Sequence, residues 1–573
     1  MSQPAMSDNA ASNKVPSVPE SGSADEVFDK EGANAVTEKA NSGLEKETAA
    51  AEDVVYPTGF RIVAIMIGLG LAVFCVSIDN TIITTAIPTI TNDFEALSDV
   101  GWYGSAYLLT FCAFNLFFGR LYQRFSVKWT FLTCLALFEI GSLICGVAPN
   151  STTLIVGRAF AGVGSSGLFS GALIILAHAT PLEKRPVYTG LIAGIYGIAS
   201  VVGPLLGGAF TDHATWRWSF YINLPIGAIT AFTIIFFFAS PPSQMTPDPN
   251  ATWGQKIMQF DPIGTLLFLP SVVCVLLALQ WGGTKYPWSD GRIIALFVLF
   301  AVLLIAFIGV QYWAGENATV PLRIIKQRSI ASAAYFSLCV GAAFFITVFY
   351  LPIWFQAVRD DNATESGINT LPMMISFTLG AIVGGGVVTT YGYYTPFLYA
   401  LVVIASIGAG LLTTFTVGIS IGKWIGYQII LGWGIGIGMQ QTLVAAQAVL
   451  PLVDVPVGTA VVIFSQMFGG SLFVSVAQNV FTNKLVEGLE TVENLGIDPR
   501  SVISTGATEI AKLITDSAVL DQVKVVYNDA IVWTFRVALI MICLSLFGAV
   551  FMEWKSVKKA SQDNKTEAAT SEA

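Results

Sequence analysis

The chain has 573 residues, of which 54% are apolar and only 12% are charged. Soluble domains carry about 25% charged residues, so a soluble multidomain enzyme and a disordered scaffold are both disfavoured. The net charge of −9 also disfavours a nucleic-acid-binding protein, because phosphate binding needs clustered Lys and Arg. The composition therefore indicates a polytopic membrane protein.

Most of the negative charge lies at the start of the chain, where residues 1–55 hold 11 acidic and 4 basic side chains. This segment is rich in Ser, Ala, Asn and Glu, and it cannot bury enough apolar area to offset the entropy of ordering it. It also lacks the basic start and apolar core of a cleaved signal peptide. We therefore expect residues 1–56 to form a disordered cytoplasmic tail.

Apolar runs follow this tail along almost the whole chain, and a run of about 20 residues can cross a bilayer as a helix. The sequence contains fourteen such spans, so we predict an all-α polytopic fold. Their approximate limits are 60–88, 100–119, 129–148, 152–176, 187–210, 221–240, 262–282, 292–312, 330–354, 370–390, 397–418, 424–449, 458–480 and 530–552. Most connections are short, except 241–261 and 481–529.

Basic residues in alternate short loops predict the orientation of the spans. They follow spans two, four, eight and fourteen, at Arg120, Arg124, Lys128, Lys184, Arg185, Arg323, Lys326, Arg328, Lys555, Lys558 and Lys559. We therefore expect both termini, including the tail 554–573, to be cytoplasmic and the loop 481–529 to be external. The sequon at Asn362 is then external and a candidate for glycosylation, whereas the sequon at Asn317 is cytoplasmic and unused.

Two pairs of similar segments indicate an internal duplication. Residues 119–132 resemble 385–398, and PLEKRPVYTG at 181–190 resembles PLVDVPVGTA at 451–460, at offsets of 266 and 270. Two pairs at nearly the same offset predict six-helix halves at 57–240 and 330–553. The segment 241–329 is then an insertion, with a cytoplasmic loop and two helices. Such parallel repeats are typical of transporters whose site lies between the halves.

The seven cysteines all fall inside apolar spans without paired spacing, which favours small packing residues over a disulfide framework or a zinc site. His178 and His213 have no metal-binding partner nearby in the sequence, so we expect no metal site. The sequence also has no GxxxxGK[ST] loop, which disfavours coupling to ATP.

Charged residues inside the spans are few, and such residues usually face a cavity or one another. Asp79, Glu139 and Arg158 are the candidates for proton coupling, because a buried carboxylate can alternate between a neutral form and a form that is charged beside a cation. Arg158 lies at a similar depth to Asp79 and is the expected cation. The alternative interpretation is a static ion pair that locks two helices together. Arg536 lies near a span end, and we expect its side chain to extend to the membrane–water interface.

The fifth span has an unusual run of small residues, GLIAGIYGIASVVGPLLGG at 190–208. Glycines let a neighbouring helix approach closely, and a proline removes a backbone hydrogen bond and permits a bend. The residues that we single out are Gly190, Gly203, Pro204, Gly207 and Gly208.

Several stretches together resemble the fourteen-span drug:proton antiporters of the major facilitator superfamily, and most of all the fungal toxin and multidrug efflux branch. They are SIDNTIITTAIPTI at 77–90, GRLYQRFSVKW at 119–129, GRAFAGVGSSG at 157–167, the segment 190–208, WRWSFYINLPIG at 216–227, LALQWGG at 277–283 and YLPIWFQAV at 350–358. The resemblance covers about residues 57–555. It implies efflux of a hydrophobic compound driven by inward proton flow, with the proton gradient and no cofactor as the energy source.

Three residues depart from these motifs: Gln123 stands where an acid is usual, Ser126 where Gly is usual, and Ala199 where Gly is common. The first two put the charge relay of the loop motif in doubt. For the substrate cavity, which should be apolar with a few polar groups, the candidates by span position are Tyr107, Tyr196, Tyr350, Gln356, Gln440, Gln441, Phe464 and Gln466.

The sequence thus favours a proton-coupled exporter of a small amphipathic metabolite, toxin or drug. We expect a monomer in the plasma membrane, with a vacuolar or vesicle membrane as the alternative, and small-molecule substrate, protons and lipid as its only partners. A proton-coupled importer of a siderophore or nutrient on the same fold remains open, as does a membrane sensor that does not transport. An integral membrane enzyme is the least favoured class, because no metal cluster or nucleophile–base pair is apparent.

Overall fold

The computed structural model describes residues 56–96, 99–239, 261–283, 286–492 and 516–559. The predicted N-terminal tail, most of the loop 241–261 and the end of the C-terminal tail lie outside these residues. Within them the chain is helical, and its β-structure is confined to isolated bridges. The all-α fold predicted from the apolar spans is therefore confirmed.

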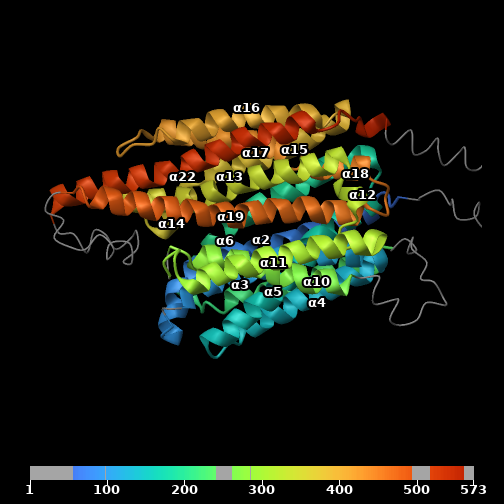
Figure 1. The fold of residues 1–573 in the computed structure, drawn as a ribbon, viewed down its shortest axis with the longest axis horizontal. Coiled ribbons are helices and arrows are strands. Elements are labelled where there is room, and N and C mark those ends of the chain that lie inside the picture. Colours follow the sequence, from blue (N-terminus) through green and yellow to red (C-terminus); the bar gives the residue numbers. More distant parts are fainter. Residues whose placement is uncertain (1–55, 97–98, 240–260, 284–285, 493–515, 560–573) are drawn as a thin grey trace, which may run out of the picture. The chain divides into compact units, whose positions relative to one another are not determined.

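The long helices run alongside one another (Figure 1). In the described part of the chain, and with α17 and α18 taken as one segment, fourteen of them follow the order of the apolar spans. They are α2 (Phe60–Phe94), α3 (Val100–Arg124), α4 (Val127–Gly146), α5 (Ser151–Ala179), α6 (Arg185–His213), α8 (Asn223–Phe237), α10 (Pro262–Trp281), α11 (Gly291–Ala314), α13 (Arg328–Arg359), α15 (Leu371–Tyr391), α16 (Thr395–Leu412), α17 with α18 (Ile421–Met439 and Gln441–Val449), α19 (Val455–Leu489) and α22 (Ser517–Phe551). Short helical turns join some of them: η2 (Leu182–Lys184), α7 (Trp218–Tyr221), η3 (Gly315–Asn317), α12 (Leu322–Ile325) and α14 (Ala363–Asn369).

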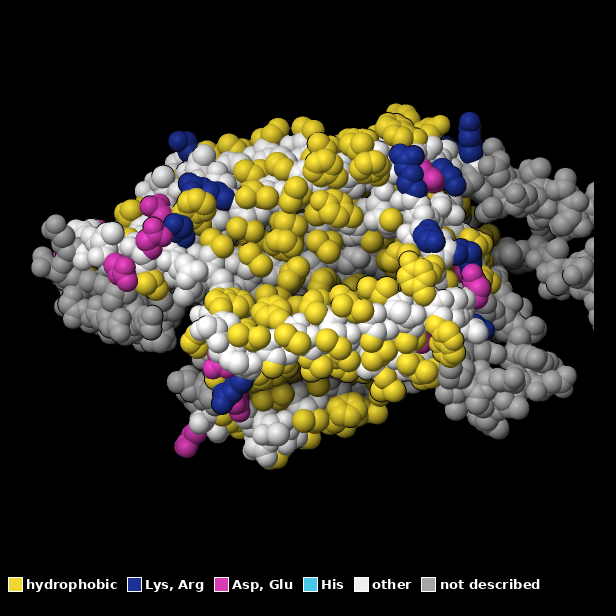
Figure 2. All heavy atoms as spheres, viewed as in Figure 1, with side chains coloured by type: hydrophobic (Ala, Val, Ile, Leu, Met, Phe, Trp, Pro, Cys, Tyr) yellow, Lys and Arg dark blue, Asp and Glu magenta, His cyan; other side chains and the backbone are white. Residues whose placement is uncertain are grey.

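Among the described residues, thirteen helices are long and apolar enough to cross a membrane by length and composition. The helix α3 is not among them, because Gly, Ser, Tyr and Asn interrupt its apolar residues. On the face drawn in Figure 2, hydrophobic side chains cover the middle of the helices and most charged side chains lie near the two ends. The most apolar stretch of α11 is only 11% buried. Apolar surface of this extent contacts lipid, so the chain is a multi-pass membrane protein.

The helices at the two ends of the chain pack in the same pattern. In the N-terminal group (α2–α8), α2 packs on α6 and α8, and α5 packs on α3 and α4. In the C-terminal group (α13–α22), α13 packs on α19 and α22, and α17 packs on α15 and α16. Between the groups, α6 packs on α15 and α3 packs on α19. The inserted pair α10 and α11 pack together, and α10 also contacts α3 and α19.

The glycines of α6 let it contact both groups closely. A Cβ on Gly190 would meet the backbone carbonyl of Ala381 in α15, and a Cβ on Gly203 or Gly207 would meet Thr81 or Ile82 in α2. Gly208 has no neighbour within 4 Å, so it does not serve the close approach that we predicted. The helix remains continuous across Pro204.

Adjacent glycines on α15 offer a test of this close packing. A Cβ on Gly385 would meet the carbonyl oxygen of Pro186 in α6, whereas Gly386 has open space. We expect Gly385→Ala to lower the free energy of unfolding by about 1–3 kcal/mol through overpacking. Gly386→Ala should be neutral or slightly stabilising, because Ala is the better helix former by about 1 kcal/mol. Thermal unfolding of the detergent-purified variants measures both, and equal loss in the two would contradict the α6–α15 packing.

The predicted loop 481–529 is too long, because helices occupy both of its ends. The helix α19 continues to Leu489 and α22 begins at Ser517. Their extensions are amphipathic, with buried residues every three to four positions: Phe481, Leu485, Leu489, Val519, Val523 and Tyr527. Polar residues between these positions lower the hydropathy, which is why the apolar runs end before the helices do.

Candidate functional site

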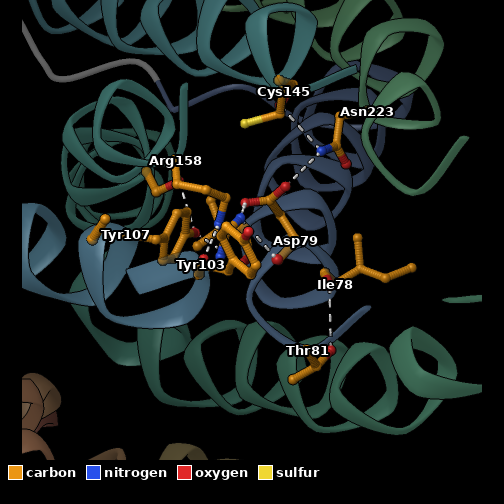
Figure 3. Close-up of polar contacts among 12 residues, drawn as sticks. Ile78, Asp79, Thr81, Tyr103, Tyr107, Cys145, Arg158 and Asn223 are labelled. Atoms are coloured by element: carbon orange, nitrogen blue, oxygen red, sulfur yellow. Dashed lines mark hydrogen bonds and ion pairs between the residues drawn. The ribbon is translucent and has the colours of Figure 1, made fainter. Parts of the chain in front are cut away.

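The centre of the N-terminal group holds a buried ion pair between Asp79 of α2 and Arg158 of α5. The Arg158 Nη1 atom donates to Asp79 Oδ2 at 2.6 Å and also to the Asp79 backbone carbonyl at 3.2 Å. Neither side chain is exposed to solvent. Figure 3 shows the carboxylate and the guanidinium pointing toward each other. The sequence placed both residues at a similar depth, and the structure brings them into direct contact.

Neighbouring helices hold both members of the pair in place. Asn223 of α8 donates to Asp79 Oδ1 at 3.1 Å, and Arg158 Nε donates to the Tyr103 carbonyl of α3 at 2.8 Å. The guanidinium also lies 4.5 Å from the centre of the Tyr107 ring, within the range of a cation–π interaction. Arg158 Nη2 has no hydrogen-bond partner. A buried charge pair held by this many contacts avoids part of its desolvation cost, but it depends on both charges being present.

Glu139 of α4 lies apart from the pair and has no donor of its own. Both carboxylate oxygens are buried and have no hydrogen-bond partner among the described residues, and the carboxyl group packs against Gly227 of α8, where a Cβ would overlap it. One helical turn away, Asn223 contacts both Ser142 of α4 and Asp79. Glu139 is therefore about one helical turn, roughly 5 Å, from the polar contacts of the pair. Of the predicted proton-coupling residues, the structure joins Asp79 with Arg158 and leaves Glu139 unpaired.

A narrow pocket lies between the two helix groups, with space for about one water molecule. Its walls come from α5 and α6 on one side and from α13, α15, α17 and α19 on the other. The lining residues are Phe169, Leu173, Ile192, Ala193, Tyr196, Phe344, Phe377, Met439, Gln440, Gln466 and Met467. Three of the candidate cavity residues, Tyr196, Gln440 and Gln466, line this pocket, and their contact with a substrate remains a prediction.

The other predicted cavity residues do not line this pocket. Tyr107 is engaged beside Arg158, and its hydroxyl donates to Ser165 at 2.8 Å. Tyr350 donates to Gln478, Gln356 donates to Ser366, and Gln441 at the start of α18 donates to the Ile437 carbonyl of α17. Phe464 stacks on Phe468. Each of these side chains therefore interacts with a neighbouring protein group. Their positions within the spans alone had made them candidates for ligand contact.

Residues from three distant segments form an interhelical clamp that the sequence did not indicate; its members are Arg120, Gln123, Glu316, Arg323 and Asp454. Arg120 donates to the Glu316 carbonyl at 2.6 Å, and Gln123 Nε2 donates to Asp454 Oδ1 at 3.0 Å. Arg323 forms ion pairs with Glu316 and Asp454. Hydrogen bonds to Asp454 and then to Glu316 raise the pKa of Arg323, which therefore stays charged. The inserted segment thus connects α3 of the N-terminal group with α19 of the C-terminal group.

The clamp explains why Gln123 can replace the usual acid of the loop motif. Asp454 is only 1% exposed and begins α19. An acid at position 123 would face this carboxylate as a like charge, whereas the amide donates a hydrogen bond to it. The loop motif therefore contacts the start of α19 through an amide–carboxylate hydrogen bond, in place of the charge relay that the sequence puts in doubt.

The remaining sequence-based expectations concern peripheral groups. Asn362 is exposed and caps α14, with its side chain accepting a hydrogen bond from the Glu365 amide at 2.8 Å, and its glycosylation remains a prediction. Arg536 is exposed and lies 4.2 Å from the centre of the Trp533 ring. No group of three or more His, Cys, Asp or Glu that could hold a metal ion occurs in the part of the chain that the structure describes.

Comparison with known proteins places this site in a family. Residues 69–476 match the family model described as Major Facilitator Superfamily. "MFS-type transporter phomT" of Diaporthe leptostromiformis is 64% identical over 504 residues, covering 88% of this chain and 85% of the relative. "MFS-type efflux pump MFS1" of Arthroderma benhamiae is 57% identical over 531 residues, covering 91% and 98%. "Efflux pump aflT" of Aspergillus parasiticus is 53% identical over 510 residues, covering 89% and 99%.

A solved structure supports the fold independently of these sequences. The structure of the proton:xylose symporter XylE aligns with a TM-score of 0.54 and 12% identity, covering 86% of this chain and 94% of that one. At this identity the likeness concerns the fold alone. Together with the high identity to the fungal transporters, it agrees with the motifs at 77–90, 157–167 and 190–208. The chain belongs to the Major Facilitator Superfamily, and within it to the fungal toxin-efflux type.

Proposed function

We propose that this chain is a proton-coupled antiporter that exports a hydrophobic or amphipathic small molecule. Export is supported by the names of close relatives, two of which are called efflux pumps at 57% and 53% identity. The proton gradient would supply the energy without a cofactor, and the activity would be transport rather than enzymatic turnover. The observation that carries the proton coupling is the fully buried pair of Asp79 and Arg158.

The pair can respond to a single proton. When Asp79 takes up a proton, Arg158 loses its counter-ion inside the membrane, and the paired arrangement is no longer favoured. Glu139 offers a second carboxyl group; it lies one helical turn along α4 from Ser142, which Asn223 contacts. Because an ionised carboxylate without any donor is costly to bury, we infer that Glu139 carries its proton in this conformation. Asp79 and Glu139 would then form a proton path through α2, α4 and α8.

A contact between α2 and α6 would link the proton site to the substrate pocket. Ser77, two residues before Asp79, donates to the Tyr196 carbonyl at 2.9 Å and contacts the Ser200 hydroxyl at 3.2 Å. Tyr196 itself lines the pocket. A shift of α2 on protonation of Asp79 would therefore reach the pocket directly, through the face where Gly203 lets the two helices approach.

The membrane arrangement that we propose has fourteen spans, with α3 as the span that composition alone does not identify. The repeated packing pattern supports two six-helix halves, at 57–240 and 330–553, around the inserted segment 241–329. Basic residues from two loops predicted to be cytoplasmic, Arg120 and Arg124 after span two and Arg323 after span eight, meet around Glu316 and Asn317. This supports cytoplasmic termini and a clamp at the cytoplasmic end. We further propose a monomer in the plasma membrane.

The test is proton movement in response to substrate. We expect purified full-length protein in liposomes with an acidic lumen to accumulate substrate inside and to release luminal protons as it does so. A pH-sensitive dye in the lumen and a fluorescent substrate report the two fluxes together, with protein-free liposomes as the control. Proton movement in the same direction as substrate would indicate an importer, and binding without any flux would indicate a sensor.

A further inference from the structure

Two amide side chains in the pocket lack partners. Gln440 lies at the break between α17 and α18, and Gln466 lies on α19. They are 8% and 7% exposed, and neither side chain has a hydrogen-bond partner among the described residues. Both line the pocket. Buried polar groups are normally hydrogen-bonded, so these amides offer donors and acceptors to a ligand.

The pocket carries no charge to match an ionic ligand. None of its lining residues is Asp, Glu, Lys, Arg or His. Asp79 lies two residues from Ser77, which bonds to the pocket residue Tyr196, but its carboxylate is already neutralised by Arg158. A permanent cation or anion that entered the pocket would lose its hydration without gaining a counter-ion, which is costly.

Aromatic and thioether side chains define the shape of the remaining wall. The rings of Phe344 and Phe377 lie 5.2 Å apart, and those of Phe169 and Tyr196 lie 5.9 Å apart. One ring pair belongs to the C-terminal group and the other to the N-terminal group, so a ligand between the groups would meet aromatic surface on both sides. Met439 and Met467 add flexible apolar surface that adapts to irregular shapes.

We propose that the cargo is an uncharged, planar aromatic compound with carbonyl or hydroxyl groups, bound between the two ring pairs and hydrogen-bonded to Gln440 and Gln466. It enters when the two helix groups move apart and widen the pocket, which in this conformation has space for about one water molecule. This inference rests on the proposed function for its role in transport, but it concerns binding and can be tested without a gradient. The site should bind permanent cations poorly, because none of its lining residues supplies a carboxylate as a counter-ion.

A matched pair of ligands tests the charge selectivity. Equilibrium binding of a monohydroxy-anthraquinone to the detergent-purified full-length chain is compared with binding of the same compound bearing a trimethylammonium group. We expect the neutral ligand to bind about a hundredfold more tightly, since burying an unpaired cation is expensive. Equal affinity, or no binding of either ligand, would overturn the inference.

Variants of the amides test the position of the site. Gln440→Leu and Gln466→Leu should each weaken binding of the neutral ligand about tenfold through loss of a buried hydrogen bond. Gln440→Glu should instead improve binding of the cationic ligand about tenfold by supplying a counter-charge. Gln428→Leu is the matched control, because Gln428 is a buried amide on α17 that bonds to the Asn369 carbonyl outside the pocket. If it changes the affinity ratio as much as the pocket variants do, the proposed site is wrong.

Transport measurements separate this inference from the proposed function. Selective binding of the neutral ligand without proton-driven uptake into liposomes would leave the site intact and overturn the antiporter. Proton-driven uptake of both ligands at equal rates would leave the antiporter intact and overturn the substrate class.

Discussion

Replacing Asp79 with Asn is expected to abolish accumulation of substrate against a gradient while leaving downhill exchange measurable. The amide keeps the size of the carboxyl group but cannot carry a proton through the cycle. It also leaves Arg158 buried without a counter-ion, which should lower the free energy of unfolding by about 3 kcal/mol. Uptake into liposomes with and without an imposed pH difference measures the coupling, and thermal unfolding measures the stability.

A double variant separates proton coupling from a purely structural ion pair. In Asp79→Asn with Arg158→Gln both charges are removed, so most of the lost stability should return. If the pair only locks α2 to α5, uphill transport should return as well. If Asp79 carries the proton, transport should remain uncoupled from the pH difference in the stable double variant.

The control for this experiment is an exposed pair on the same helix. Asp93 of α2 lies 3.9 Å from Arg217, and both side chains are at least one-third exposed. Such pairs contribute about 0–1 kcal/mol. Asp93→Asn should therefore leave both stability and coupling close to those of the unaltered protein.

The helices and the ion pair could be predicted from the sequence for one physical reason. A lipid environment requires long apolar runs and makes each charge inside them costly. Asp79 and Arg158 stand out against that background, and their similar depth was enough to pair them. Glu139 stood out equally, but its lack of any donor depends on how α4 meets Gly227 of α8, which no local pattern encodes.

The pocket could be predicted only in part. Phe169, Phe344 and Phe377 lie in apolar spans where an aromatic residue that lines a cavity has the same local sequence as one that packs against lipid or another helix. Polar candidates were easier to identify, yet Gln441 and Gln356 turned out to bond to neighbouring groups. Which of two adjacent glutamines faces the pocket depends on the break at Gln440 between α17 and α18.

The clamp could not be predicted, because its charges come from loops far apart in the sequence. Arg323 and Asp454 are separated by 131 positions, and Gln123 and Asp454 by 331. In the sequence, these basic residues indicate only the orientation of the spans. Their placement depends on the inserted helices: Asp261, at the start of α10, accepts hydrogen bonds from the Thr319 amide and from Gln311 of α11. These contacts fix the segment that presents Arg323.

The second large effect is expected at Asp454, whose loss should open the end of the protein that we propose to be cytoplasmic. The carboxylate is bound by Gln123 and by Arg323, and it joins the two helix groups where Gly119 of α3 lies against Ala460 of α19. Because Arg323 is about half exposed, we expect Asp454→Ala to destabilise the clamped state relative to the open state by about 1–3 kcal/mol. A change of 1.4 kcal/mol shifts a two-state equilibrium tenfold, so the population should move strongly toward the open form.

Distances between spin labels on the two groups measure this shift. Phe125 after α3 and Tyr391 at the end of α15 are exposed, and cysteines at these positions can be labelled once the exposed Cys543 is replaced by Ser. We expect the distance distribution to broaden and lengthen in Asp454→Ala, and also in Arg323→Ala. Glu487→Ala, which removes an exposed pair with Lys484 within α19 itself, should leave the distribution unchanged.

Because the clamp includes residues of the inserted segment, an effect of Arg323→Ala equal to that of Asp454→Ala would assign the insertion a role in closing the transporter. An unchanged distribution in both variants would mean that helix packing alone keeps this end closed.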